Sequence, residues 1–344
     1  MRLEPTVVAH DELSPAAHLP PLNSYYHAWN DPPCLTPALV ALLPSAPSTR
    51  SRITTALEET MRMHPCINVR NFRSRIDMMF NWAKEEESRP TSTAGASSST
   101  NAKADLARSI FFNVDQHTPK PVPTLSFFAS VAAAYALGVL ACKENEAVSE
   151  AEMSKSSRST RTEDSRAPVV SARSSAWQKC SAHGLYALSC QALSVFEAAQ
   201  TYDLDYLVTT ILHVLFLMHD GKPRVSHLVY PLVGKMVNIS YMMGLSTDPS
   251  EYPGKYSVFD TEMRRRIWWD VYFYDVFVSD CMGQAPIIQD NTYTTKMPAD
   301  VDEEQFGPSS SSLPVPVPRG AGGDPSEVGF AYFVQKCRCV GSVF

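Results

Sequence analysis

The chain has 344 residues, of which 30 are lysine or arginine and 36 aspartate or glutamate, for a net charge of −6. Hydrophobic residues make up 44%, enough for a sizeable core, whereas 26 prolines and only 19% charged residues indicate long uncharged connectors. The acidic balance argues against a chain that wraps nucleic acid by itself, because phosphate binding needs a concentrated excess of basic residues.

The first third of the sequence predicts one small helical unit between two polar segments. Residues 1–48 carry nine prolines, a pattern typical of an extended tail. Apolar residues then recur at helical spacing in two stretches, 53–64 and 72–83, and Pro65 separates them. From residue 85 the composition changes to Ser, Thr, Ala and Gly, which cannot bury enough apolar surface to fold.

Residues 125–142 form the most apolar stretch of the chain. The segment is rich in alanine, contains hydroxyl side chains and lacks a basic flank directly before it, so we expect a buried core helix and not a membrane span. A polar stretch over 149–175 predicts a disordered insert. Its hydroxyl residues between Arg158 and Thr162 suit a protein kinase, and equally suit a solvated spacer.

Residues 176–300 predict the main helical block, with apolar stripes over 177–199, 204–218, 225–243 and 263–278. Gly244 follows the third stripe, as a left-handed helix end requires, and Ser257 begins the fourth. That fourth helix is apolar nearly all round and must be central. After another Pro/Ser/Gly connector, a short helical pattern begins and stops, so we expect the chain to end before its last unit is complete.

The predicted fold class is all-α: a multi-helix array of consecutive helical hairpins interrupted by disordered Ser/Pro-rich linkers. The expected organisation is a Pro-rich tail (1–48), a leading helical unit (49–84), a linker (85–120), a main domain (121–300, with the insert 149–175), a linker (301–327) and an incomplete helical segment (328–344).

Patterns that carry catalysis or metal binding are missing from this sequence. It has no nucleophile elbow, Walker loop or dinucleotide fingerprint, and its histidines are not spaced to share a helix face. Eight cysteines occur, but only Cys337 and Cys339 are close, at a spacing that suits neither a zinc ribbon nor a redox pair. We therefore expect a protein that is not an enzyme, without a cofactor in this chain, and with free thiols.

The most concentrated signal is the segment Asp260–Trp269, which contains three consecutive arginines and two tryptophans. The arginines suit phosphate contact or nuclear import, an anionic ligand, or intrahelical ion pairs. The last interpretation pairs Asp260 with Arg264, Glu262 with Arg266 and Arg266 with Asp270 at (i, i+4). Since Arg265 has no such acidic partner, its replacement by alanine is expected to cost little.

Four pieces of this region resemble one family. Met243-Gly-Leu-Ser-Thr-Asp-Pro-Ser250, Phe259-Asp-Thr-Glu-Met-Arg-Arg-Arg-Ile-Trp-Trp269, Tyr274-Asp275 and Met282-Gly-Gln-Ala-Pro-Ile-Ile288 resemble, in order and spacing, the fungal-specific transcription factor domain. This is the regulatory middle homology region of fungal zinc-cluster transcription factors. Three arginine positions typical of the family are neutral here, at Thr247, Val276 and Gln284.

The resemblance singles out motif residues with an expected structural role: Gly244, Asp248, Pro249, Glu262, Met263, Arg264, Arg265, Arg266, Trp268, Trp269, Asp275, Gly283 and Pro286.

The resemblance also implies a nuclear protein that regulates transcription without reading DNA itself. Zinc and DNA binding would belong to an N-terminal zinc cluster that is missing from this sequence, because no stretch supplies six cysteines at short spacings. Expected partners are co-regulator proteins, a second copy in a homodimer and a small-molecule effector, with no membrane. The alternative is a helical protein–protein interaction scaffold, or a truncated decoy paralogue with no DNA-linked role.

Overall fold

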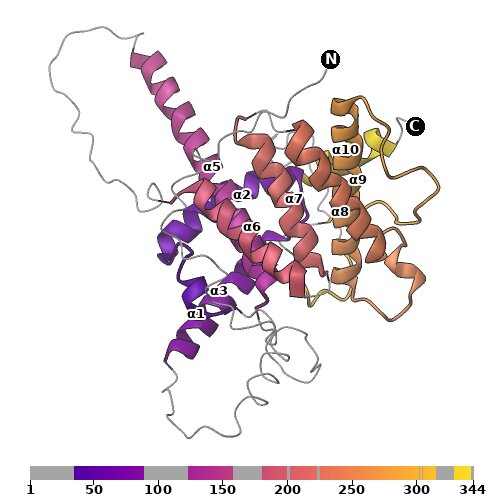
Figure 1. The fold of residues 1–344 in the computed structure, drawn as a ribbon, viewed down its shortest axis with the longest axis horizontal. Coiled ribbons are helices and arrows are strands. Elements are labelled where there is room, and N and C mark those ends of the chain that lie inside the picture. The colour runs from indigo at the N-terminus through magenta and orange to yellow at the C-terminus, as the bar shows by residue number, and fades with distance from the viewer. Residues whose placement is uncertain are drawn as a thin grey trace, which may run out of the picture.

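The protein is described by a computed structural model that covers residues 35–88, 123–157, 180–199, 202–222, 225–301, 303, 305–314 and 329–341. Within these residues every regular element is a helix, which confirms the predicted all-α class (Figure 1). The main helices are α1 (Pro37–Val40), α2 (Pro47–Met63), α3 (Val69–Glu87), α5 (Leu125–Ser157), α6 (Ala182–Ala199), α7 (Leu204–His219), α8 (Tyr230–Met242), α9 (Val258–Met282) and α10 (Gly329–Gly341).

Helix ends are set by local hydrogen bonds that the sequence supplies. Asp203 caps α7 by accepting from the Tyr206 N–H at 2.8 Å, and Ser257 caps α9 through the Asp260 N–H at 3.0 Å. Gly244 follows α8 with φ +70°, as predicted, and lets the Leu245 N–H reach the Ser240 carbonyl at 3.0 Å.

Helix α5 is the centre of the core. It packs against α2, α6 and α7 (Figure 1). Its residues from Phe127 to Ala136 are almost fully buried. The segment Leu125–Glu146 has the length and hydropathy of a membrane span, yet 89% of its most apolar window is buried inside the protein. At its crossing with α2, Gly138 leaves no room for a Cβ, which would lie 2.6 Å from the Ile53 carbonyl oxygen.

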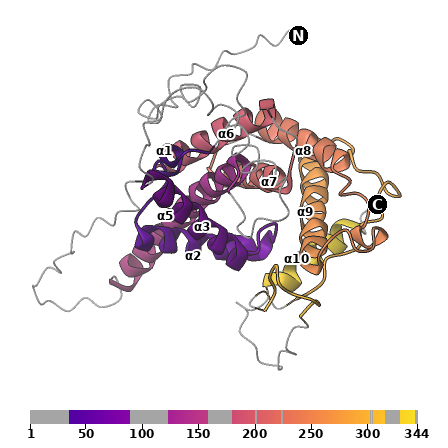
Figure 2. The same cartoon turned by 90° about the horizontal axis from the view of Figure 1, so that it is seen from below.

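The second half of the molecule is built around α9. Helix α8 packs on α7 and α9, and α10 packs on α9 and α2, so α9 stands beside the α5 core and not within it (Figure 2). Trp268, Tyr272 and Tyr274 of α9 are buried, which agrees with an apolar helix of central position in this half.

The structure differs from the expected boundaries in three places. Residues 35–48 are not a tail: Leu35, Leu39 and Leu43 are buried, because α1 packs on α3. Helix α5 continues into the expected insert as far as Ser157, where good helix formers (Glu150, Ala151, Glu152, Met153 and Lys155) alternate with serine. The expected linker 301–327 begins with packed residues, since Val301 and Phe306 lie buried against Phe259 and Met263.

The remaining linker predictions fall largely outside the described residues. This holds for residues 1–34, 89–122, 158–179 and 315–328, and for the hydroxyl cluster between Arg158 and Thr162. The short helical pattern predicted after residue 328 is α10.

Candidate functional site

The motif residues gather around the first half of α9, at the turn that follows α8. Asp248 is buried in this turn and caps the short helix Pro249–Glu251 by accepting from the Ser250 N–H at 3.0 Å and the Ser250 hydroxyl at 2.5 Å. Arg265 of α9 donates to both Asp248 oxygens, from Nε at 2.9 Å and Nη2 at 2.8 Å. This two-point pairing fixes the turn to α9.

The charge of Asp248 is held by its hydrogen bonds. Burial alone would raise the pKa of this carboxyl group. The bonds from Arg265 and Ser250, together with the backbone N–H of Lys296 at 2.9 Å, outweigh burial and hold the pKa well below its ordinary value. Asp248 is therefore ionised at neutral pH, and its charge is balanced mainly by Arg265 at 2.8 Å, with the Lys296 ammonium at 3.9 Å.

The chain after α9 runs back along that helix, and α9 side chains bind its backbone. We call residues 288–301 with Glu303 the return segment. Asp275 accepts from the Ile288 N–H at 2.7 Å, and the Trp269 indole donates to the Lys296 carbonyl at 2.9 Å. Glu262 accepts from the Ala299 N–H at 3.0 Å. The contacts move toward the start of α9 as the return segment advances, so the two run antiparallel.

Arg266 is a buried residue of α9 that pairs with an acidic residue of the same helix and with one of the return segment. Its side chain has no exposed surface and lies 3.3 Å from Glu262 and 2.6 Å from Glu303. Burial raises the pKa of Glu262, and Arg266 and the Ala299 N–H counteract that rise. Asn68 at the start of α3 donates to Glu303 at 2.9 Å, which links the return segment to the first helical unit.

The third arginine, Arg264, has a different environment. Its guanidinium lies over the Tyr256 ring, 4.4 Å from the centroid. Asp260, the expected (i, i+4) partner of Arg264, instead accepts from the Ser257 hydroxyl at 2.7 Å. Of the intrahelical pairs expected from the sequence, Glu262–Arg266 is formed and Asp260–Arg264 is replaced by the helix cap.

The other motif residues shape the helix and its ends. Met263, Trp268 and Trp269 are buried, and Pro249 is buried in the turn after α8. Gly283 ends α9 in the left-handed conformation at φ +62°, and Pro286 follows it with a carbonyl that accepts from Gln289. The structure thus brings together every motif residue from Asp248 to Trp269, with Asp275, Gly283 and Pro286 at the far end of α9.

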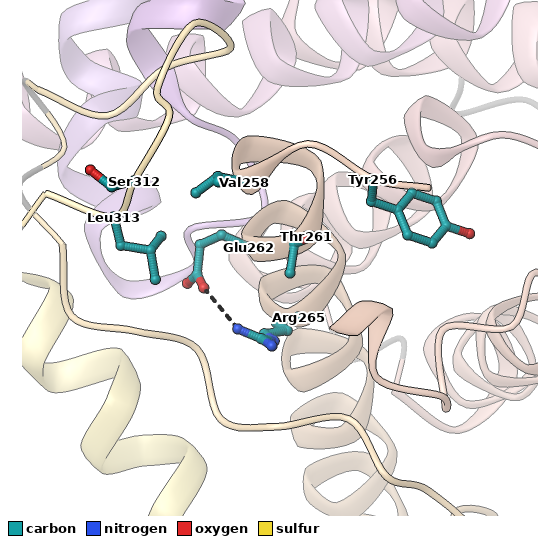
Figure 3. Close-up of a pocket in the computed structure, with 7 residues that line it drawn as sticks. All are labelled: Tyr256, Val258, Thr261, Glu262, Arg265, Ser312 and Leu313. Atoms are coloured by element: carbon teal, nitrogen blue, oxygen red, sulfur yellow. Dashed lines mark ion pairs between the residues drawn. The ribbon is translucent and has the colours of Figure 1, made fainter. Parts of the chain in front are cut away.

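A pocket of about 340 Å³ opens at the start of α9 (Figure 3). Its lining residues are Tyr256, Val258, Thr261, Glu262, Arg265, Ser312 and Leu313. Glu262 is fully buried in this lining, and its Oε2 lies 4.0 Å from Arg265 Nη1. Arg265 therefore holds Asp248 on one side and supplies the positive group at the pocket on the other.

Sequence reasoning missed the partners that complete the site. Asp248 was expected as a motif residue, but its contact with Arg265 spans 17 positions and its contact with Lys296 spans 48. Glu303 and Asn68 carried no signal at all, because their pairing joins segments 235 positions apart. Helical spacing detects neighbours three or four residues apart and cannot detect these.

The described residues contain no group of three or more His, Cys, Asp or Glu side chains arranged to hold a metal ion. The arrangement at α9 instead uses its charged groups to fasten a turn and a return segment to a helix.

Fold and motif arrangement define an all-α domain, and the comparison with family descriptions identifies it. Residues 106–315 match the family "Fungal specific transcription factor domain", and the chain belongs to this family.

Curated relatives are fungal transcription factors. The chain is 29% identical over 153 residues to the Zn(2)-C6 fungal-type transcription factor pigI of Monascus ruber, which is 44% of this chain and 18% of the relative. It is 27% identical over 125 residues to the equisetin cluster transcription factor eqxF of Fusarium heterosporum, 36% of this chain and 17% of the relative. The chain thus spans less than a fifth of the length of these relatives. No solved structure matches.

Proposed function

We propose that this chain forms the regulatory middle domain of a fungal transcription factor, acts in the nucleus, controls the genes of a cluster, and does not read DNA itself. Its relatives include transcription factors named for gene clusters, such as the equisetin and aurofusarin clusters. In this proposal a Zn(2)-C6 module, of the kind named for pigI, supplies zinc and DNA contact.

The observation that carries the proposal is the use of the three arginines. Arg266 is fully buried, Arg265 is bound to Asp248, and Arg264 lies on Tyr256. None of the three projects freely from α9, which argues against phosphate contact or an import signal as their role. The net charge of −6 supports the same view.

A reporter experiment tests this role. The chain is fused to an unrelated DNA-binding module and placed at a promoter that contains the module's site. We expect reporter expression to differ at least several-fold from that with the module alone, and Trp268→Ala to abolish the difference at equal protein level. Expression equal to that of the module alone contradicts the proposal and favours a scaffold or a decoy with no DNA-linked role. Tight, sequence-specific DNA binding by the unfused chain contradicts the view that DNA is read elsewhere.

The pocket at the start of α9 favours a second element of this function, a small-molecule effector. Its volume lies within the range of ligand pockets, at about 300–1,000 Å³. Val258 and Leu313 supply apolar walls, and Arg265 Nη1 is a hydrogen-bond donor not used by Asp248. We infer a neutral ligand with an apolar body and a carbonyl oxygen.

Saturation-transfer NMR with cyclohexanone as the probe tests the pocket. We expect transfer to cyclohexanone and loss of the signal in Leu313→Trp, which fills the space. The control Phe277→Trp places the same ring on an exposed position of α9 and should leave the signal intact. An unchanged signal in Leu313→Trp would show that the probe binds elsewhere.

Co-regulator binding and a homodimer complete the proposal. Sedimentation of the whole chain at increasing concentration tests self-association, and a constant monomer mass would contradict the homodimer.

A further inference from the structure

A second buried charged site lies where α2, α9 and α10 meet, away from the pocket and the return segment. Lys336 of α10 extends into the core with only 6% of its side chain exposed. Asp270 of α9 faces it and is fully buried. A lysine is almost never buried without partners, so the surroundings of its ammonium group need a full account.

The ammonium group has three acceptors within reach. Lys336 Nζ lies 3.3 Å from Asp270 Oδ1, 3.3 Å from the Met63 carbonyl oxygen and 3.2 Å from His64 Nδ1. A protonated amine has three N–H donors and no acceptor, so each donor has one partner. Burial lowers the pKa of His64 against the opposing effect of Asp270, which keeps the ring neutral, so that Nδ1 is an acceptor shared by Lys336 and the Tyr274 hydroxyl.

Aromatic rings complete the enclosure. The ammonium lies 3.8 Å from the centroid of Phe273 and 5.8 Å from that of Tyr274, both on α9, and 5.0 Å from that of Phe333 on α10. Ring faces attract a cation, most strongly when water is excluded. Tyr274 also holds the His64 ring through a hydrogen bond of 2.9 Å to Nδ1.

Most of the groups that surround the Lys336 ammonium come from α2 and α9, and few come from α10. All three hydrogen-bond acceptors and two of the three rings belong to α2, its end at His64, or α9, whereas α10 supplies the ammonium and one ring. Among the described residues, Asp270 Oδ2 has no hydrogen-bond partner, and the atom is buried. Without a cation at this position, α9 would carry a buried carboxylate with no balancing charge, which is costly.

We propose that α2 and α9 form a receptor for a primary ammonium group, that Lys336 is its ligand within the chain, and that a free primary alkylammonium ion can occupy the same place. We call this receptor the ammonium site (Met63, His64, Asp270, Phe273, Tyr274). Docking of α10 then competes with primary amines, and the site makes the position of α10 sensitive to them. This inference does not depend on the proposed role in transcription.

Chemical rescue tests the proposal in the whole chain. Lys336→Ala removes three carbons and the ammonium, a group equal to propylammonium. We expect Lys336→Ala to lower the melting temperature by roughly 5–15 °C, the consequence of an unbalanced buried charge. Propylammonium chloride at about 100 mM should restore roughly half of the loss or more, because binding to the folded state stabilises it by mass action.

Three comparisons make the test specific. Sodium chloride at equal ionic strength should restore nothing, and tetramethylammonium, which has the charge but no N–H donors, should restore little. The control Arg338→Ala removes an exposed positive charge from the same helix and should neither lower the melting temperature nor respond to amines. Equal rescue by all three salts, or an unaltered melting temperature in Lys336→Ala, would overturn the proposal.

If Lys336→Ala does not fold, the proposal can be tested by competition in the unaltered chain. A tethered group has an effective concentration in the millimolar range, so about 100 mM propylammonium should displace Lys336 from the site in part. Hydrogen exchange of the α10 amides should then be faster in propylammonium than in sodium chloride, with no change in α6. Equal exchange of α10 in the two salts would contradict the proposal.

Discussion

Helices α5 and α9 are both long and both buried, yet different interactions hold them. α5 is surrounded by α2, α6 and α7 and buries an alanine-rich surface over nearly its whole first half. α9 buries four charged side chains, Glu262, Arg266, Asp270 and Asp275, besides its aromatic rings. Apolar burial has no direction, whereas each charged group needs a partner at a set place. The α5 half is therefore held by apolar burial, whereas the α9 half adds charged pairs that specify how distant segments meet.

The largest expected effect comes from a substitution that tests how much apolar burial on α9 contributes to the free energy of unfolding. Trp268→Ala should lower the free energy of unfolding by about 3–5 kcal/mol, the range for large aromatic deletions in cores. Urea denaturation of both chains measures the difference. Phe277→Ala, on the more exposed face of the same helix, is the control and should cost about 1 kcal/mol or less. An equal loss of unfolding free energy in both variants would contradict the assignment of Trp268 to the core-facing side of α9.

Arg265→Met tests how much the charged side chains of α9 contribute to the free energy of unfolding. It removes both hydrogen bonds to buried Asp248 and should cost about 3 kcal/mol, because that carboxylate loses its main cation and keeps only the Lys296 ammonium 3.9 Å away. The matched control Arg264→Met removes only the contact with Tyr256, worth about 0.5–1 kcal/mol. Denaturation curves of the two variants should therefore separate clearly. If they coincide, the Asp248–Arg265 pair does not hold the turn.

This prediction reverses the one made from the sequence, and the reason is physical. Within α9, Arg265 has no acidic residue four positions away, so helical spacing predicted a small effect. Asp248 lies on the preceding turn and faces Arg265 only after the chain folds back. The same holds for Lys336 and Asp270, 66 positions apart. Periodicity did predict the apolar stripes, the end of α8 at Gly244 and the burial of Trp268, since these depend on neighbours in sequence.

Boundaries between ordered and polar segments were also hard to predict, for a related reason. Residues 301–314 have the composition of a connector, but Phe306 packs on Phe259 and the Arg266 guanidinium lies 5.1 Å from its ring centroid. One or two apolar anchors among Pro, Ser and Gly do not alter composition, and they order a segment only when a receiving surface exists.

Close packing in the α5 half is tested by adding a methyl group. Gly138→Ala places a Cβ 2.6 Å from the Ile53 carbonyl oxygen, so α2 and α5 must separate, at an expected cost of about 1–3 kcal/mol. The control Gly234→Ala in α8 has room, with the nearest atom at 3.5 Å, and should stabilise the chain by about 0.5–1 kcal/mol through helix propensity. Thermal melts that move in opposite directions would confirm the close crossing, and a loss of stability in both variants would contradict it.

The smallest effect concerns a polar position beside α5. Burial, followed by the nearby charge of Asp205, raises the pKa of Asp203 to about 6, against hydrogen bonds from Ser126 at 2.6 Å and the Tyr206 N–H. A carboxyl group with a raised folded-state pKa contributes its full stability below its unfolded pKa and loses it as pH rises through about 6.

Asp203→Asn should therefore match the parent near pH 4 and exceed it by about 1 kcal/mol near pH 7.5, since asparagine also caps helices and carries no charge. Denaturation at both pH values measures this. The neighbouring control, Asp205→Asn, weakens a two-point pairing with Arg75 and should destabilise the chain at the higher pH. A loss of stability in Asp203→Asn near pH 7.5 would show that α7 needs the charge of this cap, and that the α5 half, like α9, depends on a buried ion.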